Sequence, residues 1–287
     1  MAELVTVNTN EFKLLRDLIE RTCGISLGDE KAYLIETRLA GLLAETGCTD
    51  FGTFYRLAAS DSSNALRDKV VDAMTTNETL WFRDGHPFTI LQEVLLPPLA
   101  EELRAGNRFR IRLWSAACST GQEPYTLAMC VHEFCKREPS ISPDQFEIIA
   151  TDISPSALLL AKMGRYDSSA IARGLPNEMR DRYFQQQGHV WVAGEALKRL
   201  VTFKKFNLQD SLDPLGHFDI VFMRYVTIYF SDTFKQRIYA NVARLLAPSG
   251  HLVISAVESL RGISDELIQL NHGGGNYYRC HASRSAP

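Results

Sequence analysis

Acidic residues stand where two apolar, strand-like segments of the sequence end. Glu123 follows the segment RIRLWSAA and a turn that contains Gly121, and Asp152 closes the next such segment, FEIIATD. Carboxylates near the ends of the first two strands of a nucleotide-binding sheet can hold a cationic group and the ribose hydroxyls of a ligand. The turn lacks both the GxGxxG pattern and the lysine that bind phosphates. The residues therefore favour an adenosine-containing ligand without pyrophosphate, of which S-adenosylmethionine is the common one.

Both acids also have a purely structural interpretation. The small residues around Gly121 could form a turn that binds no ligand. Asp152 could cap the helix that begins near Ser154–Pro155, because aspartate is a favoured N-cap residue. The residues by themselves leave these alternatives open.

A further group of polar residues lies earlier, in the segment TTNETLWFRDGHPF. Asn77, Thr79 and Arg83 stand there beside Trp81 and Phe82. Thr79 and Arg83 have the spacing of one helical turn, so their side chains could face one site. Asn77 or Thr79 could equally cap a surface helix. At a site, an arginine is suited to grip a carboxylate, because its planar fork of donors matches the two oxygens.

The elements that must position these residues fall into two parts. Over residues 1–76, apolar residues recur at helical spacing without a strand pattern, which predicts a small all-helical domain. Over residues 77–287, strand-like segments alternate with helical ones. This alternation predicts an α/β fold, with a mostly parallel sheet and helices on both faces. The expected strands are FRIRLWSAA, FEIIATDIS, VTFKKFNLQD, FDIVFMRYV and HLVISAVES, with NYYRCH closing the sheet edge.

One stretch fits this alternation poorly. Residues 163–206 contain turn-rich stretches, a short helical signal and the alternating segment HVWVAG. This pattern predicts a small β-hairpin insertion beside the main sheet, which we place at about residues 184–206. Ahead of the first strand, a helix is expected to break at Pro97–Pro98.

The composition limits what the protein can bind. Its 287 residues carry a net charge of −3, which argues against a nucleic-acid-binding surface. The six cysteines form no CxxC pair and the seven histidines are dispersed, so no metal site is expected. No apolar run approaches the roughly 18 residues of a membrane span. The first residues lack the pattern of a secretory signal. We expect a cytoplasmic protein without stable membrane insertion.

Several segments together resemble one family. SAACSTGQEPY and NETLWFR, with ATDIS, FDIVFMRYVTIYF and GNYYR, are similar to the CheR family of chemotaxis receptor methyltransferases essentially from end to end. The resemblance implies a Rossmann-like class I methyltransferase sheet, with S-adenosylmethionine as cofactor and S-adenosylhomocysteine as product. The implied reaction is the formation of methyl esters on specific glutamates of chemoreceptors during sensory adaptation.

The resemblance also implies partners. The helical domain resembles the part of the family that docks on the cytoplasmic helical bundle of chemoreceptors. The insertion resembles a subdomain that, in some members, holds a receptor's C-terminal tether peptide by strand addition. We expect a monomer with these protein partners.

Matching the family motifs to this chain assigns roles to ten residues. Arg83 matches a residue that borders the reaction centre and Tyr229 a tyrosine next to the transferred methyl group, and these two are the expected catalytic residues. Glu123 matches the acid that meets the methionine ammonium, and Asp152 the acid that binds the ribose. The full set expected to bind the cofactor is Asn77, Thr79, Arg83, Glu123, Asp152, Asn207, Leu208, Arg224 and Tyr225.

The chain departs from the family pattern near the expected site. Tyr225 stands where an Asn is usual, Thr227 stands where an apolar residue is usual, and the segment SAVES keeps Glu258 but lacks the usual residues before it. These differences leave an alternative open, in which the chain is a degenerate, weakly active homologue that binds a receptor or a signalling partner. A nucleic-acid or small-molecule methyltransferase is disfavoured, since the (D/N)PP(Y/F) signature is absent.

Overall fold

A domain of four helices forms the first part of the protein. The computed structural model describes residues 5–281. Asn8 caps the first helix through the backbone N–H groups of Asn10 and Glu11, and the Glu11 side chain accepts in return from Asn8 N. The buried faces of the helices share one core, which includes Leu15, Ile35 and Phe54. The elements are α1 (Thr9–Cys23), η1 (Asp29–Lys31), α2 (Ala32–Glu45), α3 (Phe51–Ser60) and α4 (Ala65–Met74).

A seven-stranded sheet forms the centre of the second part, and its strand order is β6-β2-β1-β7-β8-β10-β9. The first five of these strands run parallel, whereas β10 pairs antiparallel with both β8 and β9. If these five parallel strands are numbered 1 to 5 in chain order, their order across the sheet is 3-2-1-4-5, as in a doubly wound nucleotide-binding fold. Their bounds are β1 (Ile111–Ala116), β2 (Phe146–Asp152), β6 (Val201–Lys205), β7 (Phe218–Met223), β8 (Leu246–Val253), β9 (Leu267–His272) and β10 (Gly275–Cys280).

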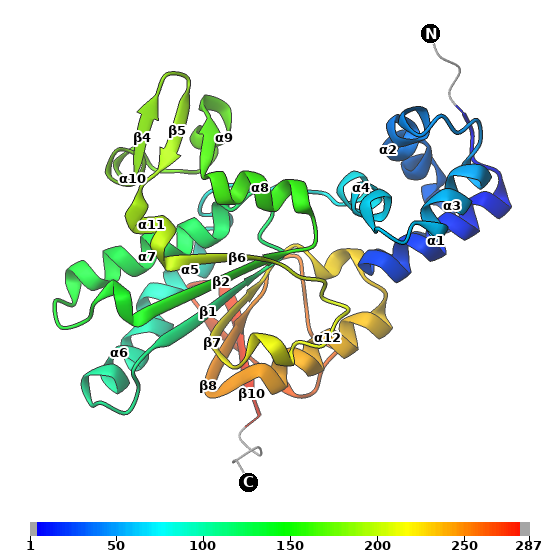
Figure 1. The fold of residues 1–287 in the computed structure, drawn as a ribbon. Helices are drawn as coiled ribbons and strands as arrows, with labels where there is room; N and C mark the ends of the chain where they lie inside the picture. The colour runs from blue at the N-terminus through cyan, green and yellow to red at the C-terminus, as the bar shows by residue number, and fades with distance from the viewer. Residues whose placement is uncertain (1–4, 282–287) are drawn as a thin grey trace.

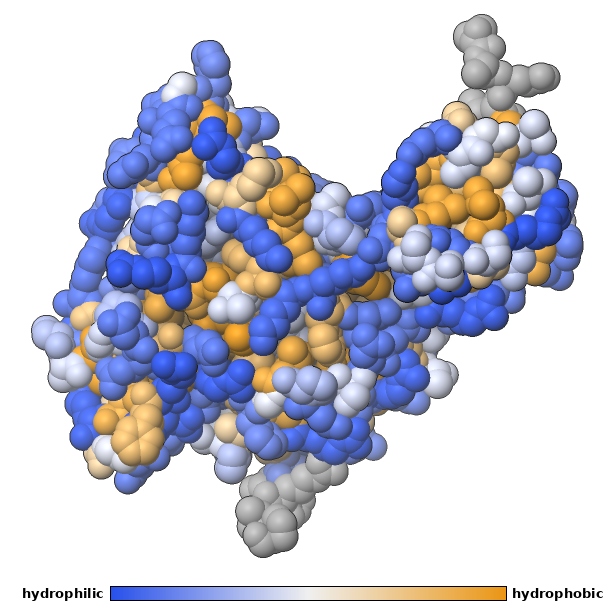
Figure 2. Space-filling view, viewed as in Figure 1, coloured by the Kyte–Doolittle hydropathy of each residue, from blue (hydrophilic) through white to orange (hydrophobic). Residues whose placement is uncertain are grey.

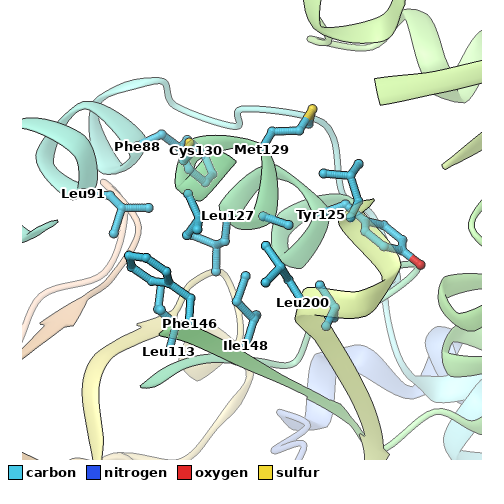
Figure 3. Close-up of a cluster of buried hydrophobic side chains, with 14 of the residues drawn as sticks. Phe88, Leu91, Leu113, Tyr125, Leu127, Met129, Cys130, Phe146, Ile148 and Leu200 are labelled. Atoms are coloured by element: carbon cyan, nitrogen blue, oxygen red, sulfur yellow. The ribbon is translucent and has the colours of Figure 1, made fainter. Parts of the chain in front are cut away.

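Helices cover both faces of this sheet, as the alternation of elements predicts (Figure 1). On one face, Leu113 and Ile148 of the strands pack with Leu127 and its neighbours (Figure 3). On the other face, Trp114 and Val221 pack against the last long helix. The covering helices are α5 (His86–Ile90), α6 (Leu96–Arg104), α7 (Gln122–Arg137), α8 (Pro155–Met163), α11 (Glu195–Leu200) and α12 (Asp232–Leu245), and the short 3₁₀ turns are η3 (Pro143–Gln145), η4 (Asp213–Leu215) and η5 (Thr227–Tyr229).

The region ahead of the first strand differs from the expected broken helix. A π-helical turn, η2 (Leu91–Leu95), joins α5 to α6 without a gap. Pro97 and Pro98 lie in the first turn of α6. Proline is tolerated there because the first N–H groups of a helix lack intrahelical partners in any case. The sequence-based prediction of a break at the prolines was therefore wrong.

A second, three-stranded sheet forms the predicted insertion, with the order β3-β5-β4. The hairpin of β4 and β5 is extended by β3, which comes from earlier in the chain. The segment 201–205, which the sequence pattern included in the insertion, is instead β6 and pairs with β2 at the edge of the main sheet. The elements are β3 (Arg165–Asp167), α9 (Ser168–Ala172), α10 (Asn177–Tyr183), β4 (Phe184–Gln187) and β5 (Val190–Ala193).

The far edge of the main sheet also differs from the expectation. The segment NYYRCH falls in β10, which lies between β8 and β9 instead of closing the edge. The edge strand is β9, which no recognised sequence pattern predicts. A hairpin through Gly273 and Gly274, both with positive φ, joins the two strands.

The helical domain lies against the carboxyl ends of the parallel strands. Ile25 forms a β-bridge with Phe230, and Ser26 N donates to the Tyr229 carbonyl at 2.9 Å. Gly24 ends α1 with φ 78°, and a Cβ there would lie 2.5 Å from the Phe234 ring, so this close packing requires glycine. Figure 1 shows the helical domain on one side of α8 and the three-stranded sheet on the other.

Candidate active site

One cavity lies at the carboxyl ends of β1, β2 and β7, between the main sheet and the helical domain. Its volume is about 950 Å³ when the open mouth is counted. All ten residues singled out from the sequence line this cavity: Asn77, Thr79, Arg83, Glu123, Asp152, Asn207, Leu208, Arg224, Tyr225 and Tyr229. The fold thus brings together residues that are up to about 150 positions apart, because parallel strands end at one edge.

Glu123 reaches the cavity from the first turn of α7. The turn before it passes through left-handed conformations, including Ala117 at φ 55° and Gly121 at φ 95°. A Cβ on Gly121 would lie 3.0 Å from the Ala161 side chain, so glycine allows α8 to approach the turn. The Glu123 carboxylate accepts from Ser115 Oγ at 2.8 Å and from an Arg224 nitrogen at 2.7 Å. These bonds fix the carboxylate but leave lone pairs for a ligand, since two oxygens can accept about four hydrogen bonds.

Arg224 follows β7 and is the most buried cation of the site. Its guanidinium bridges Glu123 and Asp84, at 2.7 Å and 2.9 Å, and also donates to the Arg83 carbonyl at 2.5 Å. Its side chain is only 2% exposed. Arg224 Nε has no hydrogen-bond partner within the part of the chain that the structure describes. Arg224 therefore ties the end of β7 to the start of α7 and to the segment of Arg83.

Asp152 closes the second strand and is almost fully buried. Its two oxygens accept from the backbone N–H groups of Ser119, at 2.7 Å, and Ser154, at 2.8 Å. Burial raises the pKa of the Asp152 carboxyl, and hydrogen bonds from backbone N–H groups oppose that shift. The N-cap of α8 is Ser154, whose hydroxyl accepts from Ala157 N. The alternative in which Asp152 itself caps this helix was therefore wrong.

The polar segment of Asn77 forms a loop and a turn instead of a helix. The helical spacing of Thr79 and Arg83 is thus not what places them at the cavity, although both line it. Ser119 Oγ donates to the Asn77 carbonyl at 2.8 Å, which fastens the loop to the turn after β1. Arg83 donates from Nη1 to the Glu78 carbonyl at 3.1 Å. The possible roles of Asn77 and Thr79 as helix caps were likewise wrong.

Asn207, Leu208 and Tyr229 form the side of the cavity that meets the helical domain. The Asn207 amide donates to the Thr22 carbonyl of α1 at 2.8 Å, and its oxygen accepts from Gln209 N. Leu208 is buried at the wall. Tyr229 packs against the cores of both parts of the protein.

Some residues of the cavity wall carried no recognised signal in the sequence. Cys23, Ile25, Thr75 and Thr76 come from the helical domain or its last turn. Thr75 and Thr76 directly precede the polar segment, so extending that motif would have found them. Cys23 and Ile25 have no such signal, since they reach the site only through the packing of the two domains.

The residues suit S-adenosylmethionine. One carboxylate lies beyond each of the first two strands, where the ligand's ammonium and ribose hydroxyls would be held. Of the two cations that line the cavity, Arg83 stacks on Tyr225 and Arg224 pairs with Asp84 and Glu123. The lining therefore has no cluster of unpaired basic groups of the kind that binds phosphate. Within residues 5–281, no group of three or more His, Cys, Asp or Glu side chains could hold a metal ion. The fold and the cavity thus define a methyltransferase that uses S-adenosylmethionine.

Comparison with known proteins gives the family. Residues 77–273 match the family described as "CheR methyltransferase, SAM binding domain", and residues 10–75 match "CheR methyltransferase, all-alpha domain". The chain therefore belongs to the CheR methyltransferase family, and its cofactor is S-adenosylmethionine.

Relatives match over nearly the whole chain. The chain is 42% identical to chemotaxis protein methyltransferase Cher2 of Pseudomonas putida over 266 residues, which cover 92% of this chain and 96% of the relative. It is 43% identical to a chemotaxis protein methyltransferase of Vibrio anguillarum over 272 residues, covering 94% and 97%. Chemotaxis protein methyltransferase 1 of Pseudomonas aeruginosa is 42% identical over 270 residues, with the same coverage of 94% and 97%.

We expect the exchange Asp152→Asn to weaken S-adenosylmethionine binding by about tenfold to thirtyfold. The exchange removes a charged acceptor and turns an amide NH₂ toward one of two backbone N–H donors, leaving that donor without an acceptor. Isothermal titration with S-adenosylmethionine and S-adenosylhomocysteine measures the effect. The exposed Asp144→Asn, on η3, is the matched control and should bind as the wild type does. Equal affinities for the wild type and Asp152→Asn would show that Asp152 only organises the turn.

Proposed function

We propose that the protein transfers the methyl group of S-adenosylmethionine to glutamate side chains on the cytoplasmic helical bundle of chemoreceptors, forming glutamate methyl esters. The relatives named above are chemotaxis protein methyltransferases, which supports a chemotaxis substrate. The position of Arg83 is the observation that most supports a carboxylate as the group that is methylated. Its guanidinium lies at the same cavity as Glu123 and Asp152, where it can grip an incoming acid.

Methyl transfer to a carboxylate requires the protein mainly to align the two reacting groups. A glutamate carboxylate, with an ordinary pKa of about 4.3, is already ionised and nucleophilic at neutral pH. Its oxygen attacks the sulfonium methyl carbon, the carbon–sulfur bond breaks, and the electron pair stays on sulfur. No proton has to move, so a general base is not required. Alignment of the two groups, together with avoided solvent reorganisation, is worth roughly 7–11 kcal/mol in such reactions.

The residues have distinct proposed roles in this reaction. Glu123 binds the ammonium group of the cofactor and Asp152 its ribose hydroxyls, as their positions at the two strand ends suggest. Asn207 and Leu208 flank the adenine. Arg83 aims the substrate carboxylate, and Tyr229 lies beside the methyl group. The remaining lining residues Asn77, Thr79 and Arg224 complete the proposed cofactor site, and Tyr225 lines the same cavity beside Arg83.

The partner surfaces follow from the arrangement of the domains. We assign receptor docking to residues 1–76 and catalysis to residues 77–287, with a monomer acting in the cytoplasm. Figure 2 shows a hollow between the three-stranded sheet and the helical domain, with apolar surface over α8. On α8, Leu159, Leu160 and Met163 are exposed. Exposed apolar side chains grouped in this way suit a protein partner.

The three-stranded sheet offers a second contact. Its order leaves β3 and β4 as edge strands with backbone groups available for pairing. A receptor's C-terminal tether peptide would add to one of them as a further strand. No helix in the described part of the chain combines the length and apolar character needed to cross a bilayer.

Transfer of a labelled methyl group tests the proposal directly. The protein is incubated with methyl-tritiated S-adenosylmethionine and receptor-containing membranes, and the labelled receptor is then treated with base. We expect label on the receptor that base releases as methanol, since esters hydrolyse and N-methyl groups do not. A receptor with its candidate glutamates changed to alanine is the control. Base-stable label, or no label from a protein that binds the cofactor, would contradict the proposed function.

A further inference from the structure

Tyr225 makes contacts that an asparagine at this position could not make. The Arg83 guanidinium carbon lies 3.3 Å from the centre of the Tyr225 ring. The Tyr225 hydroxyl donates to one oxygen of Asp84 at 2.8 Å, and the other Asp84 oxygen accepts from Arg224 at 2.9 Å. The ring is thus held at its far end while its face supports Arg83.

The backbone at Tyr225 is fixed as firmly as the side chain. Its φ of 58° lies in the left-handed region, which is uncommon for a large residue. The Tyr225 N–H donates to the Glu258 carboxylate at 2.9 Å, and the N–H of Thr227 in the same loop also donates to this carboxylate. A strained conformation of this kind persists only where the surroundings determine it. The ring therefore has little freedom to turn away from Arg83.

Stacking on the ring orients Arg83 through the face of its guanidinium. An aromatic ring attracts the face of a guanidinium, whereas the N–H groups point outward in its plane. Nη1 donates to the Glu78 carbonyl, which fixes the rotation of the group within that plane. The remaining edge of the fork is then available to a carboxylate. Burial and the hydrogen bond to Asp84 raise the pKa of the Tyr225 hydroxyl, and the Arg83 guanidinium opposes that shift.

We propose that Tyr225 is a positioning residue, which holds Arg83 in the orientation that grips the glutamate carboxylate of the substrate. The inference rests on the proposed function. It replaces the expectation that Tyr225 serves chiefly as a cofactor contact. An asparagine has no ring face to offer, so an asparagine at this position could not orient Arg83 in this way.

Three variants and a double variant test the inference. We expect Tyr225→Ala to lower kcat for receptor methylation about tenfold, with the Kd for S-adenosylmethionine within about threefold of the wild type. Tyr225→Phe keeps the ring face and loses only the bond to Asp84, so its kcat should stay within about threefold. In an Arg83→Ala background, Tyr225→Ala should have no further effect, because the two residues act as one unit.

The outcomes separate this inference from the proposed function. A further tenfold loss on adding Tyr225→Ala to Arg83→Ala would overturn the inference, since Tyr225 would then act without Arg83. So would a Tyr225→Ala variant with cofactor affinity more than tenfold weaker and unchanged kcat at saturation, which would make Tyr225 a cofactor contact. Both results leave receptor methylation by the wild type intact. Absence of receptor methylation by the wild type would overturn the proposed function, and this inference with it.

Discussion

Replacing Arg83 by alanine should lower kcat for receptor methylation roughly 100-fold to 1,000-fold while leaving the Kd for S-adenosylmethionine within about threefold. Removing one preorganised donor of a reaction centre commonly has an effect of this size on kcat. The cofactor should bind almost normally because both acids proposed to hold it keep their partners without the Arg83 side chain. Radiometric turnover with saturating cofactor and isothermal titration measure the two quantities separately.

Two further variants sharpen the Arg83 experiment. Arg83→Lys keeps the charge but not the planar fork, so it should recover only part of the lost activity. Arg173, an exposed neighbour that pairs with Glu78, provides the matched control, and Arg173→Ala should retain wild-type turnover. Parallel losses of turnover and cofactor affinity in Arg83→Ala would assign Arg83 to the cofactor instead of the substrate.

The exchange Glu258→Ala should reduce the free energy of unfolding by about 3–5 kcal/mol, because several buried donors lose one charged acceptor at once. The Glu258 carboxylate accepts from the backbone N–H groups of Tyr225, Thr227 and Ser255 and from two hydroxyls. Without it, these buried donors lose their acceptor together. Urea unfolding measures the change, and the Tm should fall by about 10 °C.

The loop that Glu258 holds also carries Tyr225 and Val226, which line the candidate active site, so we expect activity to fall with stability. Glu258→Gln should be less harmful, because the amide oxygen still accepts while the NH₂ opposes one set of donors. Glu195→Ala, at the exposed start of α11, is the control and should unfold as the wild type does. A Glu258→Ala protein with wild-type stability would show that water replaces the carboxylate easily.

Much of the site could be predicted from the sequence because strand ends in a parallel sheet converge. Glu123 and Asp152 were recognisable as acids that follow two apolar segments, and the fold places both at one cavity. The all-helical first part and the sheet with helices on both faces were also confirmed. These features depend on local pattern, which a single sequence displays.

Features that depend on distant contacts could not be predicted. The alternation of residues 184–206 does not reveal which sheet each strand joins, since the pairing of β6 with β2 is a contact between segments about 50 positions apart. The left-handed backbone of Tyr225 is imposed by Glu258 and Asp84 after folding. The helical spacing of Thr79 and Arg83 was misleading because Trp81 is buried against the three-stranded sheet, which holds the segment in a turn.

The shared wall of the cavity limits how freely the two domains can be exchanged between relatives. Cys23 and Ile25 come from the domain to which we assign receptor docking, yet they line the cavity that we propose binds the cofactor. A chimera that borrows a new docking domain to change its receptor preference would therefore also inherit a different pocket wall. Among substitutions that favour a new receptor, those that weaken cofactor binding would be selected against. A change of receptor preference during evolution would therefore also change the fraction of the enzyme that has cofactor bound.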